Sequence, residues 1–103
     1  MLTLRHSPLF EEKLDSLLEI IIADKPQSAL AFLIELEKKC EAICENPMLY
    51  RVSYYADDET IRDLIFKGYT IPYKISFDDS SVILLSIFKG ENPKSVRQFL
   101  SFV

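Results

Sequence analysis

The sequence predicts an α+β domain with the element order β-α-α-β-β-β, in which a helical hairpin packs on a small, mostly antiparallel sheet and a C-terminal amphipathic segment follows. Two patterns support this prediction. Apolar residues in the first half recur at the three- and four-residue spacing of a helix, and a stretch of the second half alternates apolar with polar residues. The length of 103 residues fits one domain, 1–103, and 49% hydrophobic residues provide for a core.

The N-terminal part is expected to form a short strand and a first helix. Residues 2–6 alternate apolar and polar side chains, as a strand does. Ser7 and Pro8 then have the residue types of an N-cap and of a first helical position. The helix should end near Ala23, and its apolar stripe is formed by Phe10, Leu14, Leu17, Leu18 and Ile21.

A second helix should begin at Asp24-Lys25-Pro26 and end at Asn46-Pro47. Because the link between the helices is short, the two should form an antiparallel hairpin. Cys44 follows Cys40 by one helical turn, a spacing that argues against a disulfide and favours two buried thiols. The apolar stripe of this helix is formed by Ala29, Phe32, Leu33, Leu36, Cys40 and Ile43.

Three strands are expected after a loop over residues 48–60. The first runs from Thr60 to Lys67, and Gly68 offers the turn into the second. Pro72 lies within that second strand and cannot donate a ladder hydrogen bond, which implies a bulge or an outward-facing position. After a turn at 78–80, the strand expected over residues 81–89 is nearly all apolar in its middle, which places it centrally in the sheet. The inward-facing residues of the second strand should be Tyr69, Ile71, Tyr73, Ile75 and Phe77, and residues 95–103 should form a short amphipathic helix.

Charge and rare side chains narrow the range of functions. Residues 1–59 carry a formal charge of −6 and residues 60–103 carry +2, an overall acidic balance that argues against a broad phosphate-binding surface. With a single histidine, His6, and no CxxC pair, neither a metal site nor a cofactor is expected. The apolar runs are too short to span a membrane and no signal peptide is visible, so we expect a soluble, cytoplasmic protein.

The order of the elements resembles that of the RelE/ParE superfamily of bacterial toxins. The likeness is carried by Arg62-Asp-Leu, by Gly68-Tyr69-Thr-Ile-Pro-Tyr73-Lys-Ile75 and by Val82-Ile-Leu-Leu-Ser-Ile-Phe-Lys89, and it covers nearly the whole chain. It implies the toxin of a type II toxin–antitoxin system, a growth-inhibiting, plasmid-stabilising protein that a cognate antitoxin neutralises by direct binding. RelE-like members of the superfamily cut mRNA on the ribosome, whereas ParE-like members inhibit DNA gyrase by protein binding.

The resemblance also indicates where an RNase would need its catalytic groups. Such an enzyme activates a 2′-hydroxyl and stabilises phosphorane charge, which requires several basic side chains on one face. Thr70 and Gly90 stand where RelE-like enzymes are expected to have arginines, and the tyrosine of their C-terminal segment falls near Val96. This depleted set favours the ParE-like branch and a protein without enzymatic activity of its own.

Three hypotheses stay open at this point. The first is the ParE-like gyrase inhibitor, and the second is a RelE-like ribosome-dependent RNase with Arg62, Lys74 and Lys89 as its candidate catalytic residues. The third is an inactive relative that retains only antitoxin binding. The sequence leaves the oligomeric state open. Candidate partner-binding residues are Arg62, Lys67, Lys74, Lys89, Phe99, Leu100 and Phe102.

Overall fold

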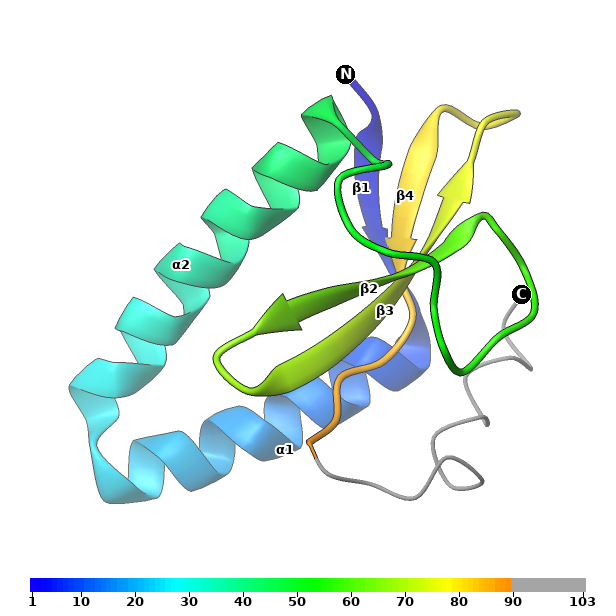
Figure 1. Ribbon diagram of the computed structural model, residues 1–103. Coiled ribbons are helices and arrows are strands. Elements are labelled where there is room, and N and C mark those ends of the chain that lie inside the picture. Colours follow the sequence, from blue (N-terminus) through cyan, green and yellow to red (C-terminus); the bar gives the residue numbers. More distant parts are fainter. Residues whose placement is uncertain (90–103) are drawn as a thin grey trace.

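The computed structural model describes residues 1–89, and the expected C-terminal segment with Phe99, Leu100 and Phe102 lies outside the described residues. Over residues 1–89 the predicted element order is confirmed (Figure 1). The sheet has the order β1-β4-β3-β2, so β4 is central as predicted. It is a mixed sheet, because β1 runs parallel to β4, whereas β3 runs antiparallel to both of its neighbours, β2 and β4. The elements are β1 (Thr3–His6), α1 (Pro8–Asp24), α2 (Pro26–Glu45), β2 (Ile61–Phe66), β3 (Tyr69–Ser76) and β4 (Ser81–Leu84).

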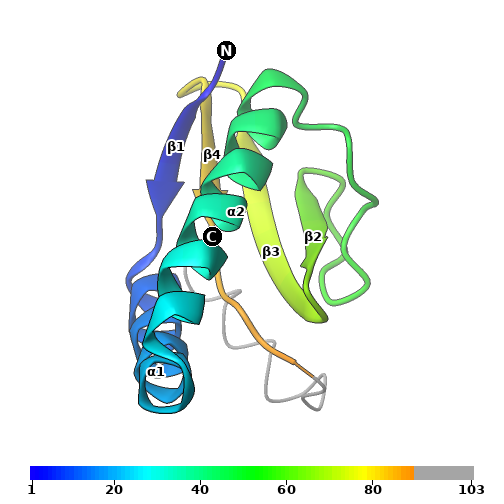
Figure 2. The ribbon, with the colours of Figure 1, turned by 90° about the vertical axis from the view of Figure 1, so that its left-hand side faces the viewer.

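The two helices form the expected hairpin, and Figure 2 shows α2 crossing in front of the sheet while α1 lies at its lower end. We call the sheet surface that α2 covers the helix face, and the opposite surface the far face. The strand register assigns side chains to these faces, because paired residues of neighbouring strands point the same way. Arg62 pairs with Tyr73 on the helix face, and Ile61 pairs with Lys74 on the far face.

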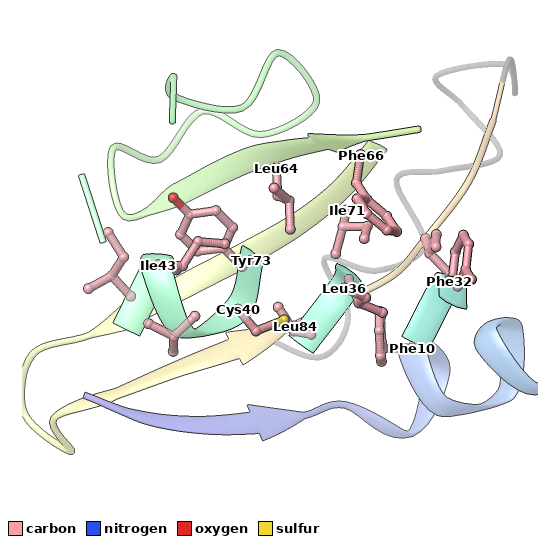
Figure 3. Close-up of a cluster of buried hydrophobic side chains, with 13 residues drawn as sticks. Phe10, Phe32, Leu36, Cys40, Ile43, Leu64, Phe66, Ile71, Tyr73 and Leu84 are labelled. Carbon is pink, nitrogen blue, oxygen red and sulfur yellow. The ribbon is translucent and has the colours of Figure 1, made fainter. Parts of the chain in front are cut away.

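The main core fills the space between α2 and the helix face. In Figure 3 the apolar residues of α2 point toward those of β2, β3 and β4, and the Tyr73 ring lies among them. The Tyr73 hydroxyl leaves this cluster and donates a 2.8 Å hydrogen bond to the Pro47 carbonyl, which satisfies its polar atom. Burial raises the pKa of Tyr73 to about 12, so the hydroxyl remains a donor at neutral pH. The buried members of the cluster are Phe10, Phe32, Leu36, Cys40, Ile43, Leu64, Phe66, Ile71, Tyr73, Ile75, Val82, Leu84 and Ile87.

Local signals account for the element boundaries. The Ser7 side chain caps α1 by accepting from the Phe10 amide at 3.0 Å, and Pro8 and Pro26 open the two helices. Lys67 and Gly68 form a two-residue turn between β2 and β3 with φ angles of 51° and 84°. Two successive positive φ angles match the right-handed twist of a hairpin, which is why glycine is favoured there.

Two side chains do not face the way the periodicity predicts. Phe77 was expected on the buried face, but β3 ends at Ser76 and the Phe77 side chain is 62% exposed in the turn. Leu33 was expected in the apolar stripe of α2, yet it is 38% exposed because it lies at the margin of the face that packs on the sheet. Tyr69 is half-buried against the core rather than enclosed by it.

The last strand is shorter than predicted, and Pro72 explains why. Residues 81–84 pair regularly with 73–76, but the next bridge joins Phe88 to Thr70, so four steps on one chain match three on the other. This extra residue lies in the segment after Leu84, opposite Pro72, where the sequence predicts a bulge or an outward-facing position. The Leu85 amide donates to the Pro72 carbonyl at 2.8 Å, whereas Pro72 has no N–H to return to Leu85.

The Leu85 carbonyl instead accepts a 2.8 Å hydrogen bond from the buried Ser7 hydroxyl. Ser7 therefore joins the start of α1 to the end of β4 while it also caps the helix. We expect the change Ser7→Ala to lower the free energy of unfolding by about 2–3 kcal/mol, because the cap is lost and a buried carbonyl loses its donor. Urea unfolding of both proteins measures this. The change Ser16→Ala is the control, since its exposed hydroxyl bonds only the Glu12 carbonyl, and an equal loss in both variants would contradict this role of Ser7.

Both cysteines are free and buried. Burial raises the pKa of the Cys40 thiol to about 12, and the pKa of Cys44 is also raised by burial. These thiols stay protonated and act as small apolar side chains of the core. Among the helices that the structure describes, none is long and apolar enough to cross a membrane.

Candidate partner-binding site

A groove of about 530 Å³ runs along the exposed flank of α1, beside the segment that follows β4. We call it the α1 groove. In Figure 1 that segment, drawn in orange, descends across α1 after leaving the sheet. The groove is lined on the α1 side by Leu9, Glu12, Lys13, Ser16, Leu17 and Ile20, and on the other side by Tyr69, Ile87, Phe88 and Lys89.

The α1 groove has an apolar floor that the described residues leave partly open. Ile20 is 69% exposed although it lies within the groove, a large exposure for an aliphatic side chain in a concave site. Phe88 is fixed in position by two contacts. Its backbone exchanges two hydrogen bonds with Thr70, at 2.9 and 3.1 Å, and the centres of the Phe88 and Tyr55 rings lie 5.1 Å apart in an edge-on arrangement. A firm floor with an exposed isoleucine is suited to an apolar surface of another polypeptide.

A second hollow, of about 330 Å³, extends the α1 groove toward the turn between the helices. The two hollows share Ile20, and Lys67 and Asp24 border the second one. Lys67 forms a 3.1 Å salt bridge with Glu35 on α2, but both side chains are largely exposed. Such a pair contributes little to stability, so Lys67 is free to exchange Glu35 for an acidic group of a partner.

Two of the four predicted basic residues therefore lie beside this groove. Lys67 is in the turn between β2 and β3, and the Lys89 ammonium lies 5.4 Å from the centre of the Tyr69 ring at the same end of the sheet. The cation and the aromatic face attract each other, which holds Lys89 over the groove wall. The groove thus has an apolar floor and a margin of basic and aromatic side chains, formed by Lys67, Tyr69 and Lys89.

The other two predicted basic residues, Arg62 and Lys74, bind groups of the loop between α2 and β2. Arg62 donates from Nε to the Glu59 carbonyl and from Nη1 to the Tyr50 carbonyl, both at 3.0 Å. Lys74 donates to Thr60 Oγ1 at 2.9 Å and pairs with Asp58 at 3.2 Å. Hydrogen bonds from the Thr60 hydroxyl and amide, helped by Lys74, hold the pKa of Asp58 at about 2.

These positions bear on the RNase hypothesis. Arg62 lies on the helix face and Lys74 on the far face, so the sheet itself separates two of the three candidate catalytic cations. Lys89 lies past the end of β4, beside the turn at the other end of β2. The three candidates are not brought together on one face. Within residues 1–89, no group of three or more histidine, cysteine, aspartate or glutamate side chains is arranged to hold a metal ion.

The apolar part of the groove is not among the sites predicted from the sequence. Ile20 stands outside the stripe predicted for α1, and an isoleucine off the buried stripe was the signal that could have found it. Ile87 and Phe88 were assigned to a central strand, and no local pattern indicates that the chain leaves the ladder at Leu85 to form a groove wall.

Comparisons with known proteins agree on one kind of relative. The profile of a family described as the ParE toxin of the type II toxin–antitoxin system parDE matches residues 4–93. No curated protein sequence matches the chain. Among solved structures, a chain of the chromosomal ParDE toxin–antitoxin system from P. aeruginosa is similar with a TM-score of 0.68 and 14% identity, covering 88% of this chain and 98% of that one.

Two structures of the E. coli toxin RelE are similar as well. A RelE mutant in complex with the antitoxin peptide RelBc has a TM-score of 0.60 and 13% identity, covering 94% of this chain and 92% of that one. The isolated RelE toxin has a TM-score of 0.62 and 12% identity, covering 99% of this chain and 98% of that one. At these identities the solved structures establish a shared fold.

Proposed function

Because the chain belongs to the ParE toxin family of type II toxin–antitoxin systems, we propose that it inhibits DNA gyrase by binding it and that a cognate antitoxin neutralises it. The observation that carries this proposal is the family match over residues 4–93, which covers all the strands and helices described within residues 1–89 except the first residue of β1. The RelE structures share the fold, so the choice between the two branches depends on the site. Both candidate targets, gyrase and the ribosome, place its action in the cytoplasm.

The separation of the basic residues supports the ParE-like branch. A nuclease has to gather positive charge around one phosphate, and each cation has to point at that phosphate. Here Arg62 and Lys74 point to opposite faces and already bind groups of the α2–β2 loop. A protein that acts by binding needs no such convergence.

We place the antitoxin in the α1 groove. An amphipathic segment with apolar residues against Ile20 and Leu17 would cover the exposed floor, and acidic residues on its flank would meet Lys67 and Lys89. This arrangement makes Lys67 and Lys89 partner-binding residues, while Arg62 and Lys74 stabilise the loop.

A supercoiling assay with purified components tests the proposed target. We expect micromolar protein to inhibit gyrase and the antitoxin to restore supercoiling, and normal supercoiling at that concentration would contradict the proposal. The same preparation is added to ribosomes carrying mRNA. Cleavage that is lost in the Arg62→Ala, Lys89→Ala double variant but kept in the Lys38→Ala, Lys39→Ala control would establish the RelE-like alternative. The control is suitable because Lys38 and Lys39 are exposed on α2 and do not line the α1 groove.

A further inference from the structure

The loop between α2 and β2, residues 46–60, presents an exposed aromatic side chain. In Figure 1 this loop, drawn in green, projects to the right of the sheet before the chain enters β2. Its Tyr54 is 77% exposed, more than any other large apolar residue within residues 2–89. A single exposed tyrosine is common on soluble proteins, so its surroundings decide whether it has a role.

Tyr54 is held in place by a buried carboxylate. Residues 51–53 run beside β2, where the Asp63 amide donates to the Arg51 carbonyl at 3.1 Å. The fully buried Asp63 side chain accepts a hydrogen bond from the Tyr54 amide and another from the Arg51 guanidinium, both at 3.3 Å. The guanidinium carbon of Arg51 in turn lies 4.1 Å from the centre of the Tyr54 ring. The sheet therefore fixes the ring and the cation in one arrangement.

Stability alone does not account for this arrangement. The Oδ1 atom of Asp63 has no hydrogen-bond partner among residues 1–89, although the carboxylate is fully buried. Burying a carboxylate is costly, and apolar side chains of similar volume are often at least as stabilising as a buried ion pair. The contacts do restrict the rotamers of Arg51 and Tyr54 before any partner arrives, which lowers the entropy cost of binding. Tyrosine and arginine are also among the residues that contribute most to affinity at protein–protein interfaces.

Arg51, Tyr54 and Ile65 lie together on the far face, at the corner of the sheet formed by β2. Ile61 and Asp63 point to the far face, and Ile65 follows them at the two-residue period of a strand. Ile65 is 44% exposed, and the Arg51 side chain that pairs with Asp63 is 39% exposed. We call Arg51, Tyr54 and Ile65 the Tyr54 patch.

The loop that carries Tyr54 has unpaired negative charge. Asp57 and Glu59 are exposed, and neither forms an ion pair within residues 1–89. Arg51 does not neutralise them, because its guanidinium is bound to Asp63. A surface that covers the Tyr54 patch is therefore complementary if it carries lysine or arginine side chains opposite these two carboxylates.

The Tyr54 patch also adjoins the α1 groove. Tyr55 follows Tyr54 in the chain, and its ring lies 5.1 Å from that of Phe88, which lines the groove. Leu9, another residue that lines the groove, packs against the same small apolar cluster as Tyr55. The two surfaces are thus neighbours, with separate exposed side chains.

We propose that the Tyr54 patch is the surface through which this chain binds gyrase. The occupant is a folded protein surface whose apolar side chains pack on the Tyr54 ring and on Ile65, and whose lysine or arginine side chains face Asp57 and Glu59. This inference rests on the proposed function, since it names the surface for that target. It also gives neutralisation a physical basis, because a large protein seated on Tyr54 extends over the α1 groove and excludes the antitoxin.

Inhibition of supercoiling by purified gyrase, measured with the full chain and its variants, tests the proposal. We expect Tyr54→Ala to raise the concentration for half-inhibition at least about 30-fold, the loss typical of a central aromatic residue of an interface. Tyr54→Phe keeps the ring and should stay within about threefold of the unchanged protein. The control Phe77→Ala removes an exposed ring outside the patch and should change inhibition less than about twofold. Thermal unfolding of each variant checks that the fold is intact.

The double variant Asp57→Lys, Glu59→Lys tests the charge of the occupant. We expect it to weaken inhibition about tenfold, because two attractions become repulsions, and the difference should shrink as salt is added. Asp15→Lys, Glu19→Lys is the matched control. It makes the same change in net charge at exposed positions of α1 that do not line the α1 groove, and it should inhibit like the unchanged protein.

The outcomes separate this inference from the proposed function. If the unchanged protein inhibits gyrase and Tyr54→Ala inhibits it equally well, the Tyr54 patch is not the binding surface, while the proposed function stands. Equal losses in Tyr54→Ala and Phe77→Ala, or in the two charge variants, would also overturn the inference. If the unchanged protein leaves gyrase unaffected, the proposed function and this inference are both wrong.

Discussion

The change Ile20→Glu is expected to weaken antitoxin binding at least about 100-fold, because it removes roughly 2 kcal/mol of apolar burial and introduces an unpaired charge at the interface. Ile20 lies where the two hollows of the α1 groove meet, so a partner that fills the groove has to cover it. Its side chain is 69% exposed in the free chain, and the substitution should leave the fold intact. Titration calorimetry with the antitoxin measures the effect, and cells that express both proteins should lose neutralisation.

Ile22→Glu is the matched control for this experiment. Ile22 is on the same helix and 50% exposed, but it lines neither hollow of the groove. Both variants add the same charge to α1 and remove the same side chain. If the antitoxin binds Ile20→Glu as tightly as the unchanged protein, or if both variants lose affinity equally, the α1 groove is not its binding site.

The change Phe10→Ala should lower the free energy of unfolding by about 3–5 kcal/mol, the cost of deleting an enclosed aromatic ring. Phe10 is fully buried where α1, α2 and β4 meet, and its ring lies 5.1 Å from that of His6. For a domain of this size the loss is a large share of the total stability, and the melting temperature should fall by roughly 15 °C or more.

Phe77→Ala removes the same side chain from the turn before β4. Because Phe77 is 62% exposed, we expect a change within about 0.5 kcal/mol. Thermal and urea unfolding of both variants give the comparison. Similar losses at the two positions would mean that Phe77 packs against the protein, and would contradict the assignment of Phe10 as a central core residue.

Most of the fold could be predicted because its signals are local. Ser7, Pro8 and Pro26 set the helix starts through side-chain capping and a fixed φ angle, which act within one turn. Gly68 marks its hairpin because the turn requires a positive φ angle. The periodicity of the second helix correctly identified most of its buried side chains, with Leu33 at the margin.

The parts that could not be predicted depend on distant segments. No property of residues 3–6 indicates that they pair in parallel with 81–84, because that choice is made by the whole sheet. The early end of β4 depends on Pro72 in the neighbouring strand, which has no N–H to donate to the Leu85 carbonyl. It depends also on Ser7, whose hydroxyl donates to that carbonyl instead. Phe77 was placed inward because alternation alone does not indicate where a strand ends.

The candidate site was predicted in part. Lys67 and Lys89 do border a groove, but Arg62 and Lys74 belong to another region. Counting outward from the two-residue turn at Lys67-Gly68 pairs Arg62 with Tyr73 and leaves Lys74 opposite Ile61. That count assigns the two cations to opposite faces from the sequence alone, provided that the turn length is known.

The pairing of β1 with β4 has a consequence for the chain as it leaves the ribosome. Thr3 of β1 pairs with Ser81 of β4, so β1 cannot take its place in the sheet until β4 has been synthesised. At elongation rates of about 5–20 residues per second, that interval lasts on the order of 4–16 s. The helical hairpin can form early, but Phe10 and the other core residues stay uncovered until β4 has emerged, and a nascent chain in this interval is open to chaperones and proteases before it can act as a toxin.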